Sequence, residues 1–305
     1  MRVAAIDQGT NTTRLLIADV DDGRLEEVVR RTEITRLGEG VDERHRLLPL
    51  PVARVRNCLT EYRREAERFG AERTLLVATS AVRDAENGEA FLGEIEWSYG
   101  FATRLLSGDE EAELMLRGVG AIAPGTLVLD IGGGSTELVT LDSRVSLDVG
   151  SVRLTERFLH TDPPTYDELE ASAEQVRALL PQLDAKSAIG VAGTITSLAA
   201  LDLGLDEYDR KRVHGHELSR AGVERQLERL AALPLAERRE VPALEPERAP
   251  VIVAGAVIAR EVLAAYGLDA MRVSENDILD GVAHAAAELP TPVEGDAPPG
   301  AYTCC

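Results

Sequence analysis

A glycine-rich acidic turn occurs twice in this chain, each time between two short apolar runs. The first copy is Asp7-Gln8-Gly9-Thr10-Asn11-Thr12, and the second, about 120 residues later, is Asp130-Ile131-Gly132-Gly133-Gly134-Ser135-Thr136. Apolar runs on both sides of a tight turn are typical of a strand–turn–strand hairpin. Glycine lets the backbone approach a phosphate closely, while N–H and hydroxyl groups donate to it and an Asp can hold a metal. Two such hairpins facing each other would clamp one polyphosphate chain.

The composition restricts the classes of protein that remain. The chain has 305 residues, of which 44% are hydrophobic and 28% charged, which is ordinary for a globular protein of two domains. No apolar run is long enough to span a membrane, and Met1-Arg2 leads directly into a strand rather than a signal peptide, so we expect a cytoplasmic protein. Cys58, Cys304 and Cys305 predict neither a disulfide framework nor a zinc site.

The net charge of −20 argues against a nucleic-acid or membrane partner, because such partners require a basic surface. A polyanionic substrate is compatible with this charge only if arginines gather around it. Arginine suits that task because its guanidinium binds phosphate through two parallel hydrogen bonds.

The two halves of the chain show a similar order of elements, which indicates a duplication. Each half begins with three strands, at 3–7, 14–19 and 25–32 in the first and at 126–131, 136–141 and 145–149 in the second, and then alternates helices with strands. We predict an N-terminal domain at 1–123, completed by a final helix at 277–287, and a second domain at 124–276. Residues 290–305, rich in Pro and Gly, are expected to form a disordered tail.

A third glycine turn, Gly190-Val191-Ala192-Gly193-Thr194-Ile195-Thr196, joins a predicted strand to a predicted helix. Gly193 and Thr194 would there present helix N-terminal N–H groups to an anion. An ordinary connection capped by Thr194 explains the same residues equally well.

The two hairpins and the third turn resemble the phosphate-binding loops of the actin, sugar kinase and Hsp70 superfamily. Further segments resemble one family within it, the exopolyphosphatase and guanosine pentaphosphate phosphohydrolase (Ppx/GppA) family, from about residue 3 to 287. These segments are Ala78-Thr79-Ser80-Ala81-Val82-Arg83-Asp84-Ala85, Leu106-Ser107-Gly108-Asp109-Glu110-Glu111-Ala112-Glu113-Leu114, Asp130 to Glu137, and Val273-Ser274-Glu275-Asn276-Asp277-Ile278-Leu279-Asp280-Gly281. The resemblance implies an α/β fold of two duplicated ribonuclease H-like domains with a cleft between them.

The resemblance also assigns roles that the residues alone leave open. Glu111 corresponds to the catalytic base of the family, although a helix-start charge is the simpler reading of its position, and Glu110 is its nearest rival. Arg83 falls in a segment associated with substrate phosphate. Asp130 and Glu137 match the family's metal position, which implies Mg²⁺, with Mn²⁺ as the alternative ion. The remaining predicted phosphate-binding residues are Asp7, Gly9, Thr10, Asn11, Arg14, Gly132, Gly133, Gly134, Ser135, Thr136, Gly193 and Thr194.

The implied function is removal of the terminal phosphate from inorganic polyphosphate by an in-line attack of water. Hydrolysis of guanosine pentaphosphate is the close alternative, and a non-catalytic sensor of alarmone or polyphosphate is an alternative of another class. A sugar or carboxylate kinase is disfavoured by the Ser-Gly-x-Glu-Glu-Ala segment. Larger family members carry an extra C-terminal helical region that this chain does not show, which favours short substrates. The family further implies a homodimer.

Overall fold

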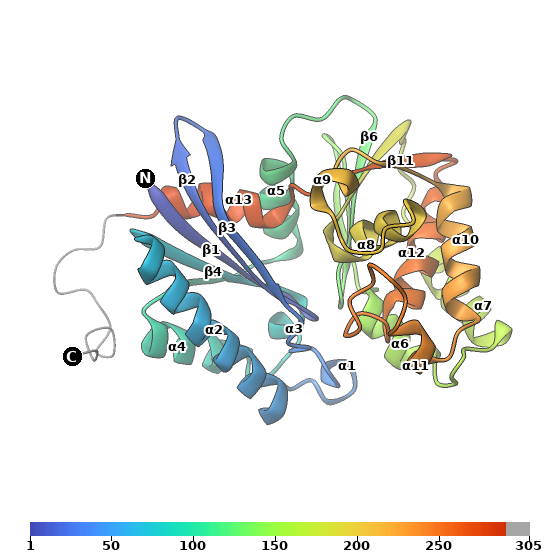
Figure 1. Ribbon diagram of the computed structural model, residues 1–305, viewed down its shortest axis with the longest axis horizontal. Helices are drawn as coiled ribbons and strands as arrows, with labels where there is room; N and C mark the ends of the chain where they lie inside the picture. The colour runs from blue at the N-terminus through green and yellow to red at the C-terminus, as the bar shows by residue number, and fades with distance from the viewer. Residues whose placement is uncertain (291–305) are drawn as a thin grey trace. The chain divides into compact units, whose positions relative to one another are not determined.

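A computed structural model describes residues 1–290, and the chain divides into two compact units (Figure 1). Unit 1 comprises Met1–Gly120 and the segment that begins at Ile278, and unit 2 comprises Ala121–Asp277. The predicted disordered tail falls, from Thr291 on, outside the described residues. Among the described residues, no helix combines the length and the apolar character that crossing a membrane requires.

Unit 1 is built on a five-stranded sheet with the order β3 (Arg24–Glu33), β2 (Thr13–Asp21), β1 (Arg2–Gln8), β4 (Arg73–Ala78) and β5 (Ala102–Leu105). The pairs β1–β2 and β2–β3 are antiparallel, whereas β1–β4 and β4–β5 are parallel. Alternate side chains of the strands point to opposite faces, so the apolar strands bury both faces of this sheet.

Helices cover both faces. Ala4, Ile6, Leu15 and Ile17 pack on one face with α2 (Pro49–Phe69) and α4 (Gly88–Tyr99). α13 (Ile278–Ala287), drawn in red in Figure 1, contacts β1, β2 and β4 and packs on α5 (Gly108–Val119). The helix at the far end of the sequence therefore completes the N-terminal unit. The short helices α1 (Val41–Arg44) and α3 (Ser80–Arg83) lie in the connections.

Unit 2 repeats this frame and extends it. Its strand order is β10 (Glu217–Ser219), β11 (Ala270–Val273), β9 (Ser187–Val191), β6 (Thr126–Ile131), β7 (Thr136–Val139) and β8 (Arg144–Leu147). The run β8-β7-β6-β9-β11 has the same order and directions as β3-β2-β1-β4-β5. The predicted duplicated α/β fold is therefore confirmed, and β10 is an antiparallel addition.

One helix of unit 2 is apolar over most of its surface. α12 (Ile252–Ala265) is buried along most of its length and contacts α6 (Ser151–Phe158), α7 (Tyr166–Leu179), α8 (Ala192–Asp202) and α10 (Arg220–Ala231). A helix with so few polar residues belongs in a core, and α12 packs at the core of unit 2. The short helices α9 (Arg210–Val213) and α11 (Leu235–Arg238) complete the unit.

Candidate active site

The two glycine turns have the same backbone geometry. In unit 1 the N–H of Gly9 donates to the carbonyl of Thr12 at 2.9 Å, and in unit 2 the N–H of Gly132 donates to the carbonyl of Ser135 at 3.0 Å. A Cβ placed at Gly9 would lie 3.3 Å from the Thr12 oxygen, and one at Gly132 would lie 3.1 Å from the Ser135 oxygen. Both turns are thus too tight for a side chain at their first glycine without some adjustment.

The turn of unit 1 is fastened through its carbonyl groups. The carbonyl of Thr10 accepts from the N–H of Gly38 at 2.8 Å, and that of Asn11 accepts from the N–H of Arg36 at 2.9 Å. Within residues 1–290, the N–H groups of Thr10 and Asn11 donate no hydrogen bond to the chain. A turn whose carbonyls are occupied and whose N–H groups are not is arranged to receive an anion.

The turn of unit 2 is fastened in the same way, but to the first turn of a helix. The N–H groups of Ser151 and Val152, at the start of α6, donate to the carbonyls of Gly132 and Gly133 at 2.9 and 2.8 Å. The N–H groups of Gly133 and Gly134 likewise donate no hydrogen bond within the described chain. The contact requires close backbone approach, since a Cβ at Gly150 would lie 2.4 Å from the Gly133 oxygen.

Two hydroxyl groups of these turns bind the protein itself. The Thr10 and Ser80 hydroxyls share a hydrogen bond of 2.8 Å, which ties the first turn to the segment after β4. The Thr136 hydroxyl donates to the carbonyl of Val149 at 2.6 Å. These two hydroxyls therefore hold the turns in shape.

Asp130 and Glu137 are direct partners in the antiparallel ladder of β6 and β7. Opposite residues in such a ladder project to the same face, with Cβ atoms about 5 Å apart. Both carboxylates are buried, at 9% and 2% exposure, and the hydroxyl of Ser146 on β8 donates to Oε1 of Glu137 at 2.8 Å. Two buried carboxylates on one face suit a hard divalent cation.

These carboxylates would form only part of a coordination shell. In the described part of the chain, no group of three or more His, Cys, Asp and Glu side chains is placed to hold a metal ion. Magnesium fits such a partial site, because it usually keeps several waters and binds substrate phosphate together with one or two carboxylates.

The equivalent pair in unit 1 has opposite charges. Asp7 is the ladder partner of Arg14, and the Arg14 guanidinium donates to Oδ2 of Asp7 through Nε at 3.0 Å and Nη2 at 2.6 Å. Both side chains are largely buried, at 14% exposure for Arg14 and 7% for Asp7. The carboxylate of the first hairpin is thus balanced by an arginine of the same hairpin.

Glu110 and Glu111 have different surroundings in the structure. Glu110 completes a capping box at the start of α5: its carboxylate accepts from the N–H and hydroxyl of Ser107 at 2.8 and 2.9 Å. These bonds hold the pKa of Glu110 below its ordinary value. Glu111 points elsewhere, is buried, and lies 3.6 Å from the guanidinium of Arg83.

Arg83 is held at the end of α3 with its guanidinium toward the Glu111 carboxylate. Its Nη1 donates to the carbonyl of Leu106 at 2.7 Å, just after β5. The side chain remains 28% exposed. Arg83 and Glu111 therefore lie together at the carboxyl ends of β4 and β5, the edge where α/β proteins bind ligands.

The third turn, at the start of α8, is tied to the second hairpin within unit 2. The Thr194 hydroxyl donates to the carbonyl of Ile131 at 3.1 Å. Arg248 is also buried there: a Cβ at Gly193 would lie 2.3 Å from its Nη1 atom. A cation at a helix N-terminus is consistent with an anion site, although Arg248 already donates to Glu245 at 2.7 Å.

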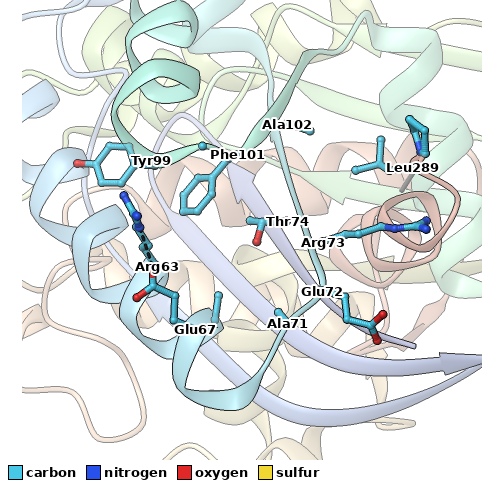
Figure 2. Close-up of a pocket in the computed structure, with 13 residues that line it drawn as sticks. Arg63, Glu67, Ala71, Glu72, Arg73, Thr74, Tyr99, Phe101, Ala102 and Leu289 are labelled. Carbon is cyan, nitrogen blue, oxygen red and sulfur yellow. Dashed lines mark hydrogen bonds and ion pairs between the residues drawn. The ribbon is translucent and has the colours of Figure 1, made fainter. Parts of the chain in front are cut away.

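A pocket of about 330 Å³ in unit 1 lies away from Arg83 and Glu111 (Figure 2). It is lined by Arg73 and Thr74 at the amino end of β4, Ala102 at the amino end of β5, and Tyr99 and Phe101, whose rings stack. Arg83 and Glu111 follow the opposite ends of the same strands. The pocket is therefore not part of the candidate active site.

The chain is similar to known proteins over most of its length. The chain is 41% identical to "Exopolyphosphatase 2" of Mycobacterium tuberculosis over 310 residues, which cover 92% of this chain and 97% of the relative. A solved exopolyphosphatase-like protein superposes with a TM-score of 0.85 at 35% identity, over 92% of this chain and 97% of that one. The Aquifex aeolicus member of the Ppx/GppA family superposes with a TM-score of 0.76 at 32% identity, over 95% and 99%.

The model of the Ppx/GppA phosphatase family matches residues 16–288, which include Arg83, Glu111, Asp130 and Glu137. Because this match and the similarity to the mycobacterial relative both span nearly the whole chain, the protein belongs to the Ppx/GppA phosphatase family.

Proposed function

We propose that this protein is an exopolyphosphatase, which hydrolyses the terminal phosphoanhydride bond of inorganic polyphosphate. The observation that carries the proposal is the buried Glu111 beside Arg83. A phosphate-binding turn alone is shared by kinases and chaperones, whereas a buried carboxylate next to a phosphate-binding arginine supplies what hydrolysis by water requires.

Glu111 acts as the general base. Its carboxylate accepts a proton from a water molecule, whose oxygen attacks the terminal phosphorus in line with the bridging oxygen that leaves. One P–O bond forms and the bridging P–O bond breaks, so orthophosphate and a chain shorter by one phosphate are released. No covalent intermediate on the protein is involved.

Arg83 stabilises the charge on the transferred group. Its contact with the Leu106 carbonyl fixes the guanidinium, and the rest of its N–H fork is available to the equatorial oxygens of the terminal phosphate.

The glycine turns bind the phosphates next to the bond that is cleaved. The outward N–H groups of Thr10, Asn11, Gly133 and Gly134 are the donors, and Asp130 with Glu137 would hold Mg²⁺. When bound, the ion would neutralise charge on the phosphate oxygens.

A phosphate-release assay tests the proposed function. The purified protein is incubated with polyphosphates of defined length, guanosine pentaphosphate and ATP, each with Mg²⁺, with Mn²⁺ and with a chelator. We expect orthophosphate from polyphosphate, and loss of the activity in the chelator. If orthophosphate is released from guanosine pentaphosphate alone, the substrate is this alarmone and not polyphosphate. If none of the three compounds releases orthophosphate, the remaining candidate function is a non-catalytic sensor.

The predicted homodimer is tested separately, by light scattering during gel filtration.

A further inference from the structure

The hydroxyl of Ser146 contacts one of the two carboxylates proposed to hold the metal. Ser146 Oγ donates to Oε1 of Glu137 at 2.8 Å, and Glu137 itself is only 2% exposed. Ser146 is half-buried on β8 and is the ladder partner of Glu137 in the β7–β8 pair. The bond is thus built into the sheet and does not depend on a loop.

Asp130, Glu137 and Ser146 form one row across three neighbouring strands. Asp130 pairs with Glu137, and Glu137 pairs with Ser146. Ladder partners project to the same face, so Glu137 stands between a second carboxylate on one side and a hydroxyl donor on the other. The hydroxyl fixes one oxygen of Glu137 and limits rotation of the carboxylate.

The corresponding row of unit 1 shows what is particular to this arrangement. It consists of Asp7, Arg14 and Thr32, which are ladder partners in the same order. A hydroxyl residue ends both rows, but Arg14 is a donor and offers Thr32 no acceptor, and Thr32 is exposed. Only in unit 2 does the hydroxyl of the third strand have a carboxylate to orient.

We propose that Ser146 is a positioning residue that orients Glu137 for the divalent cation and thereby sets the affinity of the site for metal. This inference rests on the proposed function, because it assumes the ion at Asp130 and Glu137. Partners that hydrogen-bond a metal-binding carboxylate typically change metal affinity by about 10- to 100-fold when they are removed. Because Ser146 acts through its hydrogen bond to Glu137, its removal should weaken metal binding and not change the chemical step.

The test measures binding of Mn²⁺ by electron paramagnetic resonance in the absence of substrate. Ser146→Ala should weaken Mn²⁺ binding by about 10- to 100-fold. Ser146→Thr, which keeps a hydroxyl, should restore most of that affinity. In activity assays Ser146→Ala should need proportionally more Mg²⁺ for half-maximal rate, with kcat at saturating Mg²⁺ close to that of the unchanged protein.

Ser187→Ala is the matched control. Ser187 lies at the other end of the same sheet, where its hydroxyl shares a hydrogen bond of 3.2 Å with Thr126, so its removal should leave Mn²⁺ binding unchanged. Circular dichroism and thermal unfolding establish that each variant is folded. If Ser146→Ala does not fold, Ser146→Val, which also lacks the hydroxyl, carries the test. A folded Ser146→Ala protein that binds Mn²⁺ as tightly as the unchanged chain overturns the inference.

Asp130→Asn separates this inference from the proposed metal site. If the unchanged chain binds Mn²⁺ and Asp130→Asn abolishes the binding, the site stands, and Ser146→Ala then decides the role of Ser146 alone. If Asp130→Asn binds Mn²⁺ normally, the proposed site is wrong, and the inference about Ser146 fails with it.

Discussion

Two consecutive glutamates at the start of α5 have different surroundings, and the difference can be tested at the scale of the residue. Replacing Glu111 by Gln removes the proposed proton acceptor but keeps the shape of the side chain. We expect phosphate release to fall by about 10²- to 10⁴-fold, the usual contribution of a general base, with little change in substrate binding. Initial rates and equilibrium binding of a short polyphosphate measure the two effects.

Glu110→Gln is the control for this substitution. Glutamine serves as well as glutamate at the third position of a capping box, and Glu110 is turned toward Ser107. The variant should retain nearly full activity. If Glu110→Gln were inactive and Glu111→Gln active, the assignment of the base would be reversed.

Cys58 offers a prediction about reactivity. Burial on α2 raises the pKa of the Cys58 thiol to about 12, despite a partly opposing hydrogen bond to Tyr62. At pH 8 only about one molecule in 10⁴ would therefore carry the thiolate, which is the reactive form. Iodoacetamide should label Cys58 only after unfolding in urea, as read from the mass of its peptide. Rapid labelling of the native protein would contradict the burial.

Among the elements, α6 is the support of the second glycine turn, and Gly150 is where the two meet. Gly150→Ala would push a methyl group into the Gly133 backbone, so the turn must shift. We expect a loss of about 1–3 kcal/mol in the free energy of unfolding. A displacement of about 1 Å at a binding turn can cost about 10²-fold in rate, so activity should fall strongly as well.

Gly93→Ala makes the same chemical change as Gly150→Ala, but we expect the opposite effect on stability. Gly93 is an exposed interior residue of α4, and a Cβ there has no neighbour within 4 Å. The variant should gain up to about 1 kcal/mol in stability, as alanine does over glycine within a helix, with unchanged activity. Denaturant unfolding of both variants compares the two; equal effects would show that close backbone contact at Gly150 is unimportant.

The elements that could be predicted from the sequence are those with local signals. The hairpins follow from apolar runs around glycine, and the capping residue Thr165 marks the start of α7. α6 and β10 were not predicted. β10 has three residues, too few for a periodic pattern, and α6 begins without a side-chain cap because its first N–H groups bind the carbonyls of the second turn. The start of α6 is therefore stabilised by tertiary hydrogen bonds, which leave no local signal in the sequence.

The candidate site shows the same division between local and tertiary signals. The Ser107-Gly108-Asp109-Glu110 pattern is a capping box readable from sequence, and it distinguishes Glu110 from Glu111. Ser146 and Ser80 could not be identified in this way. Their hydrogen bonds join residues that only the strand register and the fold of each unit bring together.

At the scale of the whole molecule, α13 returns from the end of the chain to complete unit 1 and packs on the helix that carries Glu111. Gly281 makes this contact possible, since a Cβ there would lie 1.9 Å from the carbonyl oxygen of Leu114 on α5. Gly281→Ala should separate the two helices, lower stability by about 1–3 kcal/mol and reduce activity through displacement of Glu111. Denaturant unfolding and initial rates test this, and a fully active, equally stable variant would contradict it.

The duplicated frame also has a consequence for how the chain should respond to removal of the proposed metal ion. The rows Asp7–Arg14–Thr32 and Asp130–Glu137–Ser146 differ in the charge of their middle residue. In the first row the positive charge that balances the Asp carboxylate belongs to an arginine of the chain itself, whereas in the second row the proposed metal ion would supply it. Chelation should therefore act unevenly along the sequence. Hydrogen exchange at β6, β7 and β8 should accelerate in a chelator while β1 and β2 keep their protection, so that one half of an internally repeated protein loosens and the other does not.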